Sequence, residues 1–81
     1  MKIHLRLFAL AKELIGSPIV EVDLPEGSVI ADLRRSLTER MPAMEAIARI
    51  SMFAVASQYV SNEFALKEGD EVACIPPVSG G

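Results

Sequence analysis

The sequence has very little of what metal-binding and disulfide-bonded proteins use. Cys74 is its only cysteine and His4 its only histidine, so it offers no internal disulfide and no Cys/His pair with metal-site spacing. It also contains no phosphate-binding loop and no nucleophile-elbow motif. A lone imidazole has no partner to orient it, and a lone cysteine usually packs as a small hydrophobe. We therefore expect His4 on the solvated surface, Cys74 in the core, no metal site, and no catalysis by this chain alone.

Clusters of positive charge and long apolar runs are missing as well. The longest basic run is Arg34-Arg35, and eleven acidic against eight basic residues give a net charge of −3, which is unlike a nucleic-acid-binding domain. No apolar run approaches the ~20 residues that span a bilayer, and the N-terminus lacks the features of a signal peptide. These absences predict a cytoplasmic protein whose partners are neither nucleic acids nor membranes.

The apolar residues that are present make up 51% of the chain and follow the periods of strands and helices. Alternation predicts strands, spacing of three and four predicts helices, and proline and glycine mark the boundaries. The predicted strands are residues 2–8, 18–24, 51–60 and 71–77, and the predicted helices are residues 9–16, 29–41 and 43–50. We expect Ser28 to cap the longest helix.

The order of these elements predicts an α+β domain. Two initial strands, one main helix packed across the sheet and a last strand returning toward the first give a mixed sheet of the β-grasp, or ubiquitin-like, arrangement. At this length we expect a single domain over residues 1–81, with a flexible C-terminal tail at 77–81.

The tail carries the clearest functional signal. Gly80 and Gly81 make the thinnest possible peptide segment, which can enter a narrow active site. Pro76 and Pro77 favour an extended chain that projects away from the domain, and no charged side chain follows Glu71. We expect residues 77–81 to insert into a partner, with the Gly81 carboxylate as the reactive group.

A surface beside the tail is predicted to bind that partner. The alternation places Phe8 on the outward face of the first strand and Ile75 on the outward face of the last, and these strands are neighbours in a β-grasp sheet. Together with Pro76, they form a candidate apolar patch.

Three segments resemble the small, sulfur-carrying subunit of molybdopterin synthase. They are "LFALAKELIG", "LPEGSVIADLRRSL" and above all "GDEVACIPPVSGG", so the resemblance covers nearly the whole chain. It departs from the family at Lys12, Ser57 and Ile75, where arginine, asparagine and an aromatic residue are frequent.

The resemblance implies a carrier that is activated by other proteins. An E1-like adenylyltransferase would use ATP to adenylate Gly81, and a sulfurtransferase or cysteine desulfurase system would supply the sulfur of a thiocarboxylate. Gly80 would give clearance, while Pro77, Val78 and Ser79 would line the channel of the large subunit. There the sulfur would pass to the cyclic pterin precursor to form the molybdopterin dithiolene, in a heterotetramer, with no stably bound cofactor on the carrier.

Other functions share this fold. A sulfur carrier of thiazole and thiamine synthesis also ends in Gly-Gly, although it resembles a shorter chain without "ERMPAMEAIARI". A protein-conjugating ubiquitin-like modifier would join Gly81 to a lysine of another protein. A simple interaction domain with an irrelevant tail remains the last alternative.

Overall fold

The computed structural model describes residues 1–77. These residues form, in chain order, β1 (Lys2–Leu7), α1 (Ala9–Ile15), β2 (Ile19–Asp23), α2 (Ile30–Arg40), the 3-10 helix η1 (Pro42–Met44), α3 (Glu45–Ile50), β3 (Met52–Val55), β4 (Gln58–Val60) and β5 (Glu71–Ile75). Within this range, no helix has the length and apolar character needed to span a membrane.

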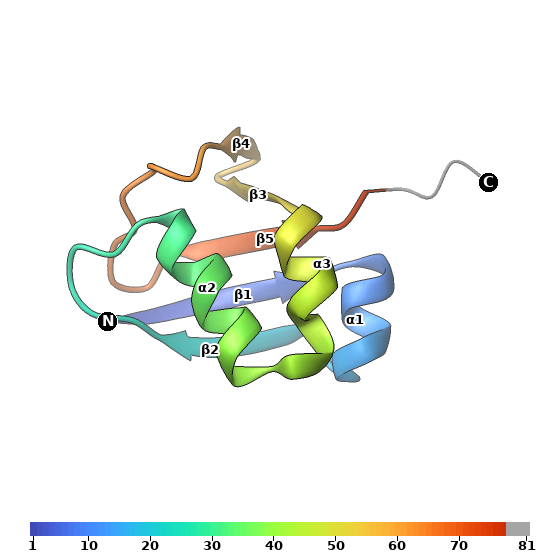
Figure 1. Cartoon of the computed structure of the whole chain (residues 1–81). Coiled ribbons are helices and arrows are strands. Elements are labelled where there is room, and N and C mark those ends of the chain that lie inside the picture. Colours follow the sequence, from blue (N-terminus) through green and yellow to red (C-terminus); the bar gives the residue numbers. More distant parts are fainter. Residues whose placement is uncertain (78–81) are drawn as a thin grey trace.

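The strands form one mixed sheet in the order β2-β1-β5-β3-β4. The first strand, β1, is antiparallel to β2 and parallel to β5, and β5 is antiparallel to β3. The last strand is therefore the central one, with helices α2 and α3 over the same sheet (Figure 1). This arrangement confirms the predicted β-grasp fold, and α1, α2 and α3 correspond to the helices predicted at residues 9–16, 29–41 and 43–50.

The core lies between the sheet and the helices. Alternate residues of the strands point to this side, and they pack with apolar residues of the helices. The buried core residues include Ile3, Leu5, Leu7, Val22, Phe53, Val72 and Cys74 from strands, and Ala11, Ile30, Leu33, Leu37, Met44, Ile47 and Ala48 from helices. The opposite face of the sheet, which we call the outer face, carries the other half of each alternating pattern.

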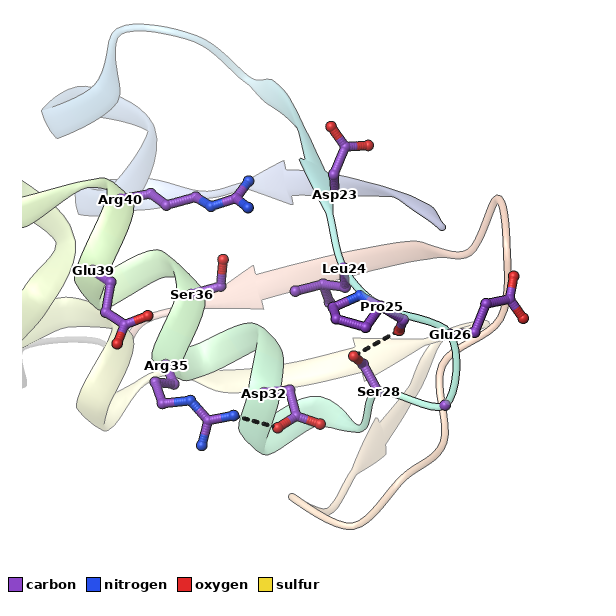
Figure 2. Close-up of a pocket in the computed structure, with 11 residues that line it drawn as sticks. Asp23, Leu24, Pro25, Glu26, Ser28, Asp32, Arg35, Ser36, Glu39 and Arg40 are labelled. Atoms are coloured by element: carbon purple, nitrogen blue, oxygen red, sulfur yellow. Dashed lines mark hydrogen bonds and ion pairs between the residues drawn. The ribbon is translucent and has the colours of Figure 1, made fainter.

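The start of α2 differs from the expected serine cap. The hydroxyl of Ser28 donates a hydrogen bond to the carbonyl oxygen of Pro25 at 2.8 Å, inside the loop before the helix (Figure 2). Two backbone N–H groups of the first turn find their acceptors in the connection between β4 and β5. The N–H of Ile30 donates to the carbonyl oxygen of Phe64, and the N–H of Ala31 donates to that of Asn62. Distant backbone thus supplies the acceptors for these two donors, and the Asp32 carboxylate accepts the N–H of Val29 at 2.8 Å.

The segment predicted as one strand over residues 51–60 is a hairpin. Strands β3 and β4 pair antiparallel across a turn in which Ala56 and Ser57 have φ of 52° and 65°. Two consecutive positive φ values are typical of tight hairpin turns. The prediction of one strand was wrong because neither residue is the glycine or asparagine that usually marks such a turn.

Candidate functional site: the outer sheet face at the root of the tail

The tail begins at the end of the central strand. Strand β5 lies between β1 and β3, so it is paired on both sides up to Cys74, and Ile75 is paired with Met52 of β3. Pro76 is buried and Pro77 is exposed. The predicted insertion residues Val78, Ser79, Gly80 and Gly81 lie outside the described part of the chain, whereas β5, which ends three residues before Val78, is held by the sheet.

Phe8 and Ile75 line one hollow on the outer face, as the predicted patch requires. Phe8 lies just beyond β1 and is 42% exposed, and Ile75 is half-buried. The burial of Pro76 differs from our expectation, because a buried ring offers little surface to a partner. The structure thus brings two of the three predicted patch residues together, and leaves their role in binding a prediction.

The hollow has a volume of about 470 Å³ and a mixed lining. Its charged wall is an ion pair, in which Nη2 and Nε of Arg6 lie 3.0 and 3.1 Å from Oε1 of Glu71. The other lining residues are Phe8, Ala54, Ala56, Ser57, Tyr59, Ala73 and Ile75. Since the two charges neutralise each other, the hollow has no unpaired charge in its wall.

The sequence analysis missed two large residues of the outer face. Tyr59 lines the hollow and is 63% exposed, and Met52 is 53% exposed and pairs with Ile75 across strands β3 and β5. Treating residues 51–60 as one strand hid the sheet position of Tyr59. The only sequence signal was the break in alternation near Ala56, where the hairpin turns.

His4 and Cys74 lie on the faces that the sequence predicted. Nδ1 of His4 is 3.9 Å from a carboxylate oxygen of Glu21 on the outer face, and its side chain is 40% exposed. Cys74 is fully buried, and this burial raises the pKa of its thiol, with Ser51 and Arg34 opposing the increase. Because a high pKa keeps the thiol protonated and burial blocks access, we assign Cys74 to packing.

A second hollow, on the helix side, is polar. It has a volume of about 420 Å³ and lies between α2 and the loop that follows β2 (Figure 2). Arg35 forms an ion pair of 2.6 Å with Asp32, and the hollow is also lined by three acidic residues and one further basic residue, namely Asp23, Glu26, Glu39 and Arg40. Within residues 1–77, no group of three or more His, Cys, Asp or Glu side chains is arranged to hold a metal ion. This hollow therefore provides neither a metal site nor a uniformly charged surface.

The fold and the central position of β5 define a ubiquitin-like β-grasp protein whose last strand leads into the tail. The model of the ThiS family matches residues 5–81. The chain belongs to this family.

Its relatives share most or all of the chain. It is 40% identical to the molybdopterin synthase sulfur carrier subunit of Dictyostelium discoideum, with 93% of this chain and 91% of the relative covered. The protein of the same name in Chlamydomonas reinhardtii is 36% identical, with both chains covered completely. Among solved structures, SAMP1 from Haloferax volcanii superimposes with a TM-score of 0.85 at 28% identity, and both chains are fully covered.

Proposed function

We propose that this chain is the sulfur carrier subunit of a molybdopterin synthase. The observation that carries the proposal is the match of the whole chain, through Gly81, to relatives of that name. The geometry supports it, because the central strand anchors the tail and an apolar hollow adjoins the root of the tail.

The chemistry that we propose takes place at the C-terminal carboxylate. A carboxylate is a poor electrophile, so an E1-like adenylyltransferase would join it to AMP from ATP and release pyrophosphate. A sulfur donor at the oxidation level of sulfide, fed by a sulfurtransferase or cysteine desulfurase system, would then displace AMP and leave a thiocarboxylate. The chain itself supplies the reactive end and its presentation, and the activating enzyme supplies the catalysis.

Delivery would take place in the large subunit of the synthase, in a heterotetramer with two carriers. The tail would enter the active site while the outer face binds the surface around its entrance. The sulfur would pass to the cyclic pterin precursor, and water would restore the Gly81 carboxylate. We place these steps in the cytoplasm, where a chain with a single thiol stays reduced.

Deleting Gly80 and Gly81 tests this proposal. We expect the truncated protein to melt at the same temperature as the full chain, because neither glycine belongs to the described core. We also expect it to support no pterin sulfuration in a reconstituted synthase, since the reactive atom is gone. A variant extended by one alanine is the matched control for the position of the carboxylate, and it should be equally inactive. A truncated carrier that still delivers sulfur would refute the proposal.

Conjugation to proteins is a second candidate function. It is favoured by the similarity to SAMP1, whose name stands for small archaeal modifier protein 1. The same adenylated Gly81 would then form an amide with a lysine of another protein. Denaturing gels of cells that express a tagged carrier would show a ladder of larger species, and the truncation would abolish the ladder.

A further inference from the structure

The hollow on the outer face has two alanines at its centre. Arg6, Ala73, Ala54 and Tyr59 are direct neighbours across strands β1, β5, β3 and β4. Their side chains lie on the same face of the sheet, so two methyl groups stand between two long side chains. We call this depression the alanine hollow. Phe8 and Ile75 complete its rim on the side of the tail.

Non-glycine residues with positive φ gather around the alanine hollow. In residues 1–77 they are Ala9, Ala56 and Ser57. Ala56 and Ser57 line the hollow, and Ala9 directly follows Phe8 on its rim. Such conformations cost about 1–2 kcal/mol per residue, and strained backbone concentrates at functional sites. The rim is therefore held in one shape at a cost in stability.

The short distance from Pro77 to Gly81 limits how far a protein that binds Gly81 can be from this rim. Gly81 is four residues beyond Pro77, and four extended residues span at most ~14 Å. A protein that holds Gly81 in its active site has its surface within that distance of Pro77, which lies two residues beyond Ile75 in the rim. Such a protein therefore lies against the alanine hollow.

The lining of the hollow indicates the chemistry of the occupant. Arg6 and Glu71 are already paired, so a charged group entering here would find no free partner in this wall. The alanine floor leaves room for a large side chain, and Phe8, Tyr59 and Ile75 offer it apolar contacts. When an uncharged, bulky side chain enters the hollow, apolar surface of both the side chain and the hollow is removed from water, and no unpaired charge is buried.

The geometry points to a knob-in-hole contact that deepens the proposed function and rests on it. One large apolar side chain of the synthase large subunit fills the alanine hollow while the tail enters the active site. Ala73 is thus a specificity-determining residue, because its small size keeps the hole open.

A size series at Ala73 tests this inference, with the large subunit from the same organism as the probe. We expect Ala73→Ser to bind nearly as the native chain does, Ala73→Val to bind more weakly, and Ala73→Leu to lose about tenfold or more in affinity. Since Ala73 faces away from the core, all three should melt close to the native chain. Valine is favoured in strands, so Ala73→Val still tests the effect of filling the hollow if the Leu variant fails to fold. Ala46→Leu, at an exposed position of α3, is the matched control and should bind normally.

Two further measurements separate the outcomes. Ile75→Lys, on the rim, should weaken binding whichever side chain fills the hole, so a loss there with a flat series at Ala73 overturns the knob-in-hole contact alone. Failure of the native chain to bind the large subunit overturns the proposed function as well. A dimer of the native chain in sedimentation that Ala73→Leu disrupts would assign the hole to a second copy and overturn the inference.

Discussion

At the scale of one residue, Arg34 connects elements that are distant in the sequence. Its Nη1 donates to the carbonyl oxygens of Ala48 and Ser51 at 2.7 and 2.8 Å, at the end of α3. Its Nη2 donates to Oδ1 of Asn62 at 3.0 Å, and its guanidinium carbon lies 4.8 Å from the ring centre of Phe53. The planar guanidinium of Arg34 thus binds carbonyl oxygens at the end of a helix and a side chain of a loop, and it lies over an aromatic ring.

We predict that Arg34→Lys lowers the free energy of unfolding by about 2 kcal/mol. Lysine keeps the charge but cannot reproduce the fork of donors or the stacking on Phe53. Arg35→Lys is the control, because Arg35 is exposed and pairs only with Asp32 in the described contacts, and its effect should stay within about 0.5 kcal/mol. Chemical denaturation measures both. Equal losses would show that the fork of Arg34 contributes no more than a surface charge.

Single positions were predictable where one face of an alternating strand decides them. The placements of Phe8, His4, Ile75 and Cys74 followed from alternation alone. The placement of Pro76 in the patch was wrong, although the alternation continues through it: Pro76 is buried like Val72 and Cys74, and Pro77 is exposed.

At the scale of an element, the β3–β4 hairpin combines an unusual turn with a functional position. Ala56 and Ser57 adopt positive φ, where a side chain is strained, and both line the alanine hollow. This turn, close to the candidate site, therefore adopts its conformation without the glycine that would relax it.

We predict that Ser57→Gly raises the free energy of unfolding by about 0.5 kcal/mol. The gain is small because glycine relieves the strain but adds entropy to the unfolded chain. Gly69→Ala is the converse change, since Gly69 has φ of 82° with open space around the new methyl group, and it should cost about 1 kcal/mol. Thermal and chemical unfolding measure both. A loss of stability in Ser57→Gly would contradict a strained turn.

Elements were predictable from sequence when local signals were complete, and were missed when distant contacts replaced them. Helix α1 ends at Gly16, which has φ of 80° and donates to Lys12, as its sequence indicates. The start of α2 uses backbone of residues 62–64 instead of the Ser28 side chain. No local pattern reveals a cap supplied from about thirty residues away.

At the scale of the whole molecule, topology explains why a small fold can present its own C-terminus. The last strand enters the middle of the sheet, parallel to the first, so the residues of the tail follow a strand that is paired on both sides. The outer face of the same strand carries the alanine hollow. The site that anchors a partner and the root of the segment that enters it are therefore parts of one strand.

The order of the predicted elements was sufficient to predict the β-grasp arrangement, with the last strand returning beside the first, but it did not predict the hairpin of β3 and β4. The hollow was only half predictable. Phe8 and Ile75 follow from strand faces, whereas Ala54 and Tyr59 join them through a hairpin that has no strong turn signal.

The central claim is that Gly81 carries sulfur, and intact mass spectrometry tests it most directly. The chain is incubated with its cognate E1-like enzyme, ATP and a sulfur source, and the variant lacking Gly80 and Gly81 is treated in parallel. We predict that the native chain gains the mass difference between sulfur and oxygen and that the truncated chain is unchanged. An unchanged native chain, with an activating enzyme that is demonstrably active, would contradict the account.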